Sequence, residues 1–334
     1  MQVPPDSVPG TGRRPLLLSC LSAAALALAP GRVRAQGYPS RSVELVVAYA
    51  PGGATDLVAR VVARGISPAL GQPVAVENRG GGGTLIGTQA VERAEADGHV
   101  LLYGTNAFVN SAVLRAPAPY DPLRDFAPVG LVAVQPLGLV VRPDLKAASV
   151  GELVALAKSA PGTLNFASSG NGSGQHLAGE LFGLQAGVEL VHVPYRGAGP
   201  ALNDLLGGRV DLMFTSLFGI MDHIQEGRLR LLATTGAHRS PAAPEAPTVA
   251  EAGVPGYAYT TWQAVFAPAG TPAAAVSRLN AALRDLGADH GFQETLAAQG
   301  LEVSTGSPAD LGAMVAREAQ AVADIARRTG ISLS

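Results

Sequence analysis

The stretch Asn165-Phe-Ala-Ser-Ser-Gly-Asn-Gly-Ser-Gly-Gln-His176 joins a short β-prone run to a loop of small residues. Leucines at 177, 181 and 184 follow with helical spacing, so a strand, a loop and a helix are predicted in that order. The loop then lies at the start of the helix, where unpaired N–H groups and the positive end of the helix dipole attract anions. Two interpretations stay open: a simple turn, with glycine at unusual dihedrals and a serine cap, or the wall of an anion site. The second would use Ser168, Ser169, Asn171 and Ser173.

The same order of strand, glycine loop and helix recurs upstream. Residues 43–49 are rich in β-branched side chains and predict a buried strand, and Pro51-Gly-Gly-Ala-Thr-Asp56 precedes the next helix. A third instance runs from a strand at 74–76 into the glycines of 80–83, and a strand at 99–103 ends at Gly104-Thr105-Asn106. This alternation predicts an α/β fold with mostly parallel sheets flanked by helices. Ligands of such folds bind beyond the carboxyl ends of the strands.

The second half of the chain repeats the pattern. Residues 107–135 carry four prolines and predict an irregular segment, after which strands are expected at 137–141, 188–193, 210–214 and 229–234. A β-prone run at 257–266 and helices that begin at Pro272 and Pro308 close the chain. We expect these last helices to pack on the first unit. The prediction is therefore two lobes, residues 36–135 with 255–334 and residues 136–254, joined by crossovers near 132–138 and 254–264.

Residues 1–35 predict a secretory signal peptide. Arg13-Arg14 precede an apolar run from Leu16 to Ala29, and Val33-Arg34-Ala35 fits a small-residue cleavage site. The run is about 14 residues long, which is too short to span a bilayer. We therefore expect cleavage after Ala35 and a periplasmic location, reached by the Sec or the twin-arginine route.

Composition excludes several classes of protein. The chain has 334 residues, 47% hydrophobic and 15% charged, which suffices for one large or two medium α/β domains. Its only cysteine, Cys20, lies in the predicted signal peptide, so the mature chain has no disulfide; lipidation there is disfavoured because Leu18 fits a lipoprotein box poorly. Cleavage also removes four arginines and Asp6, which changes the formal net charge from −2 to −5. With lysine only at 146 and 158 and no basic stripe, we expect no nucleic-acid partner, and we expect a monomer.

Signatures of common enzymes are absent from the sequence. No dinucleotide fingerprint, phosphate loop or G-x-S-x-G elbow can be drawn, and the six histidines lack metal-ligand spacing. We expect no cofactor, no metal and no enzymatic activity. The competing hypothesis is a secreted enzyme that acts on a carboxylated small molecule, with Asp56 and His176 as acid and base. For His176 a ligand contact and a structural hydrogen bond are both open, whereas His192 lies in a strand and is expected to be a satisfied core residue.

A series of ordered motifs resembles the Bug family, the extracytoplasmic solute receptors of tripartite tricarboxylate transporters. The resemblance covers residues 38–334 and rests on Tyr49-Ala-Pro-Gly-Gly-Ala-Thr-Asp56, Glu77-Asn-Arg, Asp97-Gly98, Phe166-Ala-Ser-Ser-Gly, His192-Val-Pro-Tyr-Arg-Gly-Ala-Gly-Pro200, Gly208-Arg-Val-Asp211, and Trp262 with Ala267-Pro-Ala-Gly-Thr-Pro272. It implies a two-lobed periplasmic-binding-protein fold of the second type, a small organic acid as ligand, and membrane transporter subunits as partners. The ligand would be a dicarboxylate, a tricarboxylate or an acidic amino acid. A ligand-sensing co-receptor for a signalling system would use the same site.

The resemblance also implies which residues hold the carboxylate, largely through backbone N–H groups and hydroxyls. The first lobe would contribute Ala50, Pro51, Gly52, Gly53, Thr55, Asp56, Gly82, Thr105 and Asn106. The second would contribute Ser168, Ser169, Gly170, Asn171, Ser173, His176, Tyr195, Arg196, Gly197 and Ser216. The chain departs from the family pattern in three places: Gly80 and Gly82 stand for proline and alanine and loosen their loop, Ala264 stands for glycine, and Ala48 stands for proline. Arg196 either pairs with a second carboxylate of the ligand or is a solvated arginine at the rim.

Overall fold

The computed structural model describes residues 1–2, 37–195 and 197–333. The predicted signal peptide, with Arg13-Arg14 and Cys20, lies outside the described residues, and so does Arg196. All the helices and strands below belong to the unit Tyr38–Ser334. Among the described residues, no helix combines the length and the apolar character that a bilayer crossing requires.

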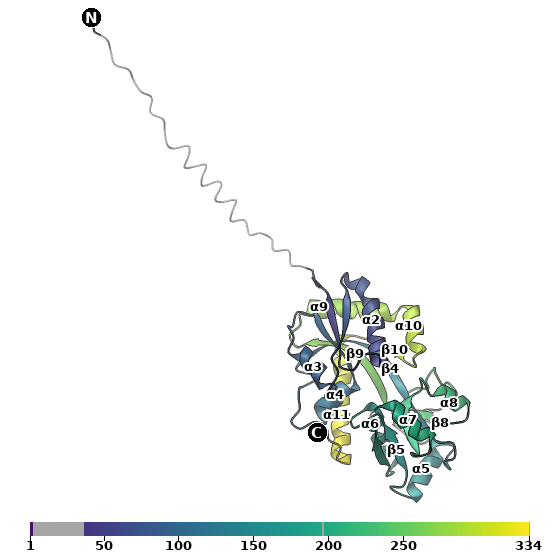
Figure 1. Ribbon diagram of the computed structural model, residues 1–334. Coiled ribbons are helices and arrows are strands. Elements are labelled where there is room, and N and C mark those ends of the chain that lie inside the picture. Colours follow the sequence, from purple (N-terminus) through teal and green to yellow (C-terminus); the bar gives the residue numbers. More distant parts are fainter. Residues whose placement is uncertain (3–36, 196, 334) are drawn as a thin grey trace. The chain divides into compact units, whose positions relative to one another are not determined.

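Six strands build the first sheet, in the order β2-β1-β3-β9-β4 with β10 on the far side of β4. Figure 1 labels β4, β9 and β10 of this sheet. β1 runs parallel to both of its neighbours, whereas β9 runs antiparallel to β3 and to β4. Side chains alternate between the two faces of β1, because Val43, Leu45 and Val47 enter one core and Val46 enters another. The strands are β1 (Val43–Val47), β2 (Val74–Asn78), β3 (Val100–Thr105), β4 (Phe126–Val141), β9 (Thr260–Pro268) and β10 (Glu302–Val303).

The second sheet follows from the other end of β4. Residues 137–141 of β4 pair antiparallel with β7 on one side and β8 on the other, and β7 continues to β5 and β6. β5 runs parallel to both β6 and β7, as the strand, loop and helix pattern predicts. The strands are β5 (Asn165–Ser168), β6 (Val191–Pro194), β7 (Leu212–Ser216) and β8 (Arg230–Thr234). The α/β prediction is confirmed, and the sheets are mixed because β4 and β9 oppose their neighbours.

Residues 107–135 correct the expectation of an irregular segment. They hold most of α4 (Asn106–Val113) and the first part of the 16-residue β4. Proline is tolerated in a strand only at edges or irregularities, and Pro128 stands next to a register shift against β9. Pro136 is the last residue of β4 that pairs with β9, so its missing N–H falls where the partner strands change.

The helices pack on both faces of each sheet. α2 and α9 cover one face of the first sheet through Val58, Val62, Leu279 and Leu283, while α4 and α11 cover the other. The predicted stripe of α6 is confirmed, because Leu177 is buried against Val322 and Ile325 of α11 with Leu181 and Leu184 beside it. The helices are α2 (Ala54–Leu70), α3 (Leu85–Glu92), α4 (Asn106–Val113), α5 (Val150–Ser159), α6 (Gly174–Ala186), α7 (Ala198–Leu206), α8 (Met221–Gln225), α9 (Ala273–Gly287), α10 (His290–Ala297) and α11 (Pro308–Thr329).

Candidate ligand-binding site

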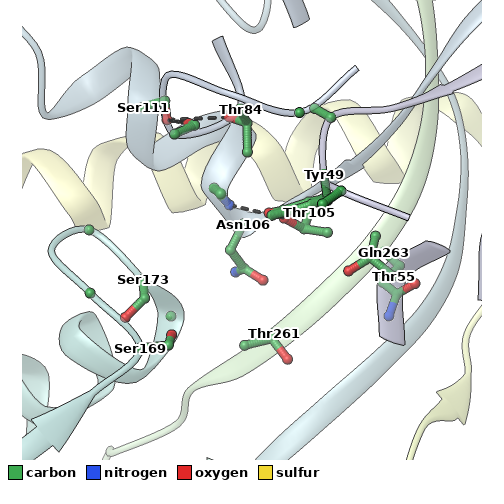
Figure 2. A pocket seen from close by; sticks show the side chains of 18 of the residues that line it. Tyr49, Thr55, Thr84, Thr105, Asn106, Ser111, Ser169, Ser173, Thr261 and Gln263 are labelled. Carbon is green, nitrogen blue, oxygen red and sulfur yellow. Dashed lines mark hydrogen bonds between the residues drawn. The ribbon is translucent and has the colours of Figure 1, made fainter. Parts of the chain in front are cut away.

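A cavity of about 770 Å³ lies at the ends of the strands, where the loops of both sheets meet. This volume is typical of sites for small molecules. Figure 2 shows the hydroxyl and amide side chains that face it from β9, from the start of α4 and from the loop before α6. The lining comprises Ala48–Pro51, Thr55, Asn78, Gly80, Gly81, Gly83, Thr84, Thr105–Ala107, Ser111, Arg115, Gln135, Ser169–Gly174, Thr261–Gln263 and Leu333.

Four helices, α2, α3, α4 and α6, begin at this cavity. Two of them carry a side-chain cap: Thr105 accepts from the N–H of Ala107 at the start of α4, and Ser173 accepts from the N–H of His176 at the start of α6. The other two, which follow Gly53 and Thr84, begin without one. The first N–H groups of a helix have no partner within it, so this wall presents donors and four positive dipole ends. Such a wall favours an anion.

The loop between β5 and α6 is shaped from behind by side chains that do not line the cavity. Ser168 is fully buried and its hydroxyl accepts from the N–H of Gly170 over 3.1 Å. The Nδ1 atom of His176 accepts from the N–H of Gly172 over 3.1 Å, so this histidine makes a structural hydrogen bond. These two bonds satisfy the N–H groups of Gly170 and Gly172 and so hold the shape of the loop.

A second histidine supports that arrangement. The rings of His176 and His192 stack with their centroids 3.6 Å apart, and His192 Nε2 lies 2.7 Å from the hydroxyl of Ser168. Burial, together with the nearby His176, lowers the pKa of His192 to about 3. His192 is therefore a neutral, hydrogen-bonded ring, but it is half-buried and not the core residue that the sequence predicted.

The loop between β1 and α2 is held by Asp56, whose side chain is buried. Its carboxylate accepts from the N–H of Gly52 over 2.8 Å and from the amide of Asn78 over 3.0 Å, and it forms an ion pair with Arg60 at 3.0 Å. Burial raises the pKa of Asp56, but the bonds from Arg60, Gly52 and Asn78 outweigh it and hold the pKa below its ordinary value. Asp56 thus fixes the path of the backbone that reaches the cavity at Ala50, Pro51 and Thr55.

The start of α4 is fixed by partners on the loop after β1, on β9 and on α11. The hydroxyls of Tyr49 and Thr105 lie 2.7 Å apart (Figure 2). Asn106 accepts from the backbone N–H of Trp262 over 2.7 Å and donates its Nδ2 to Glu318 over 2.6 Å. Both side-chain atoms of Asn106 are thereby occupied. This leaves the free backbone N–H groups of the first turn as the donors that α4 offers to a ligand.

Two hydrogen bonds connect the elements of the two sheets around the cavity. The amide of Asn110 on α4 donates over 2.8 Å to the carbonyl of Gly172, which precedes α6. Gln135 of β4 donates over 2.8 Å to the hydroxyl of Ser216 at the end of β7. Gln135 lines the cavity and Ser216 lies behind it.

About half of the predicted site residues line the cavity. These are Ala50, Pro51, Thr55, Thr105, Asn106, Ser169, Gly170, Asn171 and Ser173. Those outside the lining are Gly52, Gly53, Asp56, Gly82, Ser168, His176, Tyr195, Gly197 and Ser216. The acid and base that the enzyme hypothesis requires, Asp56 and His176, are both in this second group. Arg196 is outside the described residues, so its two interpretations stay predictions.

Several lining residues were not predicted, namely Tyr49, Ser111, Arg115, Gln135, Thr261 and Gln263. Most come from strand interiors or from a helix surface, where no glycine loop marks them. Arg115 is the only lysine, arginine, histidine, aspartate or glutamate among the described lining residues. Across the described residues, no group of three or more metal-ligating side chains forms a metal site.

The similar proteins include the following two relatives. The "UPF0065 protein in tcbD-tcbE intergenic region" of Pseudomonas sp. (strain P51) is 42% identical over 86% of this chain and 87% of its own length. The protein BugT of Bordetella pertussis is 39% identical over 90% of this chain and 93% of its own length.

Solved structures show the same fold. Rpa4515 of R. palustris, solved with adipate, is 36% identical with a TM-score of 0.77, and the match covers 88% of this chain and 99% of that one. The periplasmic binding protein BugD is also 36% identical, with a TM-score of 0.74 and the same coverage. MatC of Rhodopseudomonas palustris, solved with bound malate, is 32% identical with a TM-score of 0.73 over 86% of this chain and 99% of that one. The fold is thus the two-lobed fold of periplasmic binding proteins.

A family model places the chain among such receptors. The model described as "Tripartite tricarboxylate transporter family receptor" matches residues 58–331, which is most of the chain and includes most of the loops that build the cavity. The resemblance inferred from the sequence motifs is confirmed, and the chain belongs to the TctC, or Bug, family of tripartite tricarboxylate transporter receptors.

Proposed function

We propose that this protein is a periplasmic receptor that captures a small organic carboxylate in the cavity and delivers it to the membrane subunits of a tripartite tricarboxylate-type transporter. The observation that carries the proposal is the meeting of four helix N-termini at a cavity whose described lining contains an arginine and no acidic side chain. Each charge-assisted hydrogen bond to a carboxylate contributes about 1.5 to 3 kcal/mol. Several preformed N–H donors therefore bind the anion without a full counter-charge.

The proposal includes closure of two lobes, residues 36–135 with 255–334 and residues 136–254. The change of partners along β4 supports this division, because residues up to Pro136 pair with β9 and residues from Leu137 pair with β7 and β8. A ligand that contacts both lobes shifts the equilibrium toward the closed form by its extra affinity for that form. The hydrogen bond from Asn110 to Gly172 would be one of the contacts that closure makes.

The ligand class is supported by the similar structures. Adipate and malate, which are carried by Rpa4515 and MatC, are small organic acids of the kind that the proposed donors suit. The proposed contacts are the lining residues Ala50, Pro51, Thr55, Thr105, Asn106, Ser169, Gly170, Asn171 and Ser173. The residues behind them position these loops.

Mass spectrometry of the compound that copurifies with the native protein would identify the ligand directly. Calorimetry on protein that has been unfolded, freed of ligand and refolded would then measure binding of dicarboxylates, tricarboxylates and acidic amino acids. We expect saturable binding of at least one class and no chemical turnover. Failure of every compound to bind refolded protein, or conversion of a bound compound to a product, would overturn the proposal. Loss of carboxylate uptake after deletion of the gene, restored by the intact gene, would test delivery to a transporter.

A further inference from the structure

Glu318 of α11 supports the cavity wall from behind through two of its lining residues. Its carboxylate accepts from the Nδ2 of Asn106 over 2.6 Å and from the indole Nε1 of Trp262. Asn106 and Trp262 both line the cavity, and the side-chain oxygen of Asn106 accepts from the backbone N–H of Trp262 over 2.7 Å. The three residues therefore form one hydrogen-bonded unit at the start of α4.

A second cavity, of about 380 Å³, lies between α6, the start of β9 and α11. Glu318 and Trp262 line it, and Trp262 also lines the ligand cavity. Exposed side chains of α11, namely Arg317, Asp324 and Arg328, line it as well, so the second cavity opens to solvent. A proton can thus reach Glu318 from the second cavity while a ligand occupies the first.

Neutral groups hold the carboxylate of Glu318. Its two donors are an amide and an indole, and burial raises its pKa to about 7, although both bonds oppose the rise. The helix α4 and the strands β4 and β9 carry no titratable or charged side chain. Those that share the second cavity are Tyr259, Arg317, Asp324 and Arg328, and those on the neighbouring α6 are His176 and Glu180, which pair with each other at 3.4 Å. Burial, together with the charge of Glu318, raises the pKa of Tyr259 and keeps it neutral.

An ionised Glu318 opposes an anion at the start of α4. A ligand carboxylate that accepts from the first turn of α4 would lie within about 10 Å of Glu318, given ordinary hydrogen-bond lengths. Two like charges at this distance weaken each other's binding about tenfold, at an effective dielectric constant of about 20. A neutral Glu318 removes this repulsion. Its weaker bonds to Asn106 and Trp262 are the same with and without ligand, so they cancel in the ligand affinity.

We infer that Glu318 positions the start of α4 and couples the capture of a carboxylate to the uptake of a proton by its own carboxyl group. This inference rests on the proposed function and concerns the regulation of the same site. One anion enters the ligand cavity and one proton from solvent binds Glu318, so the two charges balance. The coupling is reciprocal: the factor by which the proton strengthens ligand binding is the factor by which the ligand strengthens proton binding. Affinity should therefore be highest below pH 7 and fall as the pH rises through 7 and 8.

Calorimetry on refolded protein tests the inference with adipate, malate and the acid that copurifies. Titrations at pH 7.5 in HEPES and in Tris, which differ in ionisation enthalpy, give the number of protons taken up per ligand. Wild type should take up about half a proton and lose about fivefold in affinity between pH 6.5 and 8.5. Glu318→Gln mimics the neutral carboxyl, so it should take up almost no proton and bind more tightly than wild type at pH 8.5. The exposed Glu294→Gln is the control and should behave like wild type.

The outcomes separate this inference from the proposed function. Binding without proton uptake, equal uptake in wild type and Glu318→Gln, or weaker binding of Glu318→Gln at pH 8.5 would overturn the role of Glu318 and leave the carboxylate receptor standing. Failure of wild type to bind any carboxylate would overturn both.

Urea unfolding shows whether Glu318→Gln is folded. If it is not, carbon-13 NMR of the glutamate carboxyl groups of wild type decides. A glutamate that titrates near pH 7 in the free protein should titrate about one pH unit higher with ligand bound. An unchanged titration would contradict the inference.

Discussion

The side-chain amide of Asn106 donates a hydrogen bond of 2.6 Å to the carboxylate of Glu318. Asn106 lines the cavity, and Glu318 on α11 lies behind it, where it also accepts from the indole Nε1 of Trp262. Burial raises the pKa of Glu318 to about 7, although the bonds from Trp262 and Asn106 oppose the rise. A carboxyl group that titrates near neutral pH thus supports the start of α4.

Glu318 should make the protein less stable as the pH rises. Its pKa is about 7 in the folded protein and 4.5 ordinarily, so the folded state binds more protons between these values and stability falls as pH increases through them. Urea unfolding at pH 4.5 and 7 should show the wild type losing about 2 kcal/mol more than Glu318→Gln over this interval. The exposed Glu294→Gln should follow the wild type. Parallel pH profiles for wild type and Glu318→Gln would contradict the assignment.

His192 should make the protein less stable as the pH falls, which is the opposite of the effect of Glu318. Its pKa is lowered from 6.5 to about 3, so the unfolded chain binds the proton more readily, and the stability present above pH 6.5 is lost as the pH falls toward 3. Between pH 6.5 and 4 we expect the free energy of unfolding of wild type to fall by about 2 kcal/mol more than that of His192→Gln. His290→Gln, at an exposed histidine, is the control. The expectation fails if the free energy of unfolding of His192→Gln depends on pH as steeply as that of the wild type.

Gly172 should be required for binding as well as for stability. It has a φ of 73°, and a Cβ atom there would lie 2.8 Å from Leu333. Gly187 has a similar φ of 63°, but a Cβ atom there meets nothing within 4 Å. Each change to alanine should cost about 1 to 2 kcal/mol of stability for the left-handed backbone. Only Gly172→Ala should displace the loop before α6, and calorimetry should show at least a tenfold loss of ligand affinity. Similar affinities of the two variants would refute this distinction.

Asp56 should stabilise the loop before α2 through its hydrogen bonds. Asp56→Asn removes the charge that pairs with Arg60, and leaves one acceptor oxygen for Gly52, Arg60 and Asn78. We expect a loss of about 1 to 2 kcal/mol in urea unfolding at pH 7, together with weaker ligand binding. Asp324→Asn breaks an exposed pair with Arg327 on α11 and should cost less than about 0.5 kcal/mol. Equal losses of unfolding free energy in the two variants would show that the buried Asp56 stabilises the protein no more than an exposed ion pair does.

Much of the fold follows from local sequence patterns. The units of strand, glycine loop and helix around Pro51, Gly80 and Gly170 were predictable, because β-branched runs, glycine and helical spacing are each local signals. The helix α4 and the first part of the strand β4, residues 126–136, were not. Thr105 caps a helix of only eight residues, and Pro128 and Pro136 lie inside a strand that tolerates them through a register shift and a change of partner.

The residues that line the cavity from loops were predictable from the sequence, whereas those that line it from strands were not. Ser169 to Ser173 and Pro51 to Thr55 stand in loops that the pattern places at one edge of a sheet. Gln263 lies in the interior of β9 and faces the cavity because β9 pairs antiparallel with β3, where it stands opposite Thr105. Arg115 meets Gly82 across 33 residues of chain, a contact that no short-range signal encodes.

The helix N-termini at the cavity bear on how such receptors diverge in evolution. A backbone N–H is carried by every residue except proline, so most substitutions in these loops leave the proposed donors in place. Sequences can therefore drift far while the capacity to hold a carboxylate is inherited. Changes in ligand range should instead concentrate at the few positions where a side chain lines the cavity, such as Thr55, Thr261 and Gln263. A comparison of the ligands of close relatives that differ at these positions would trace that history.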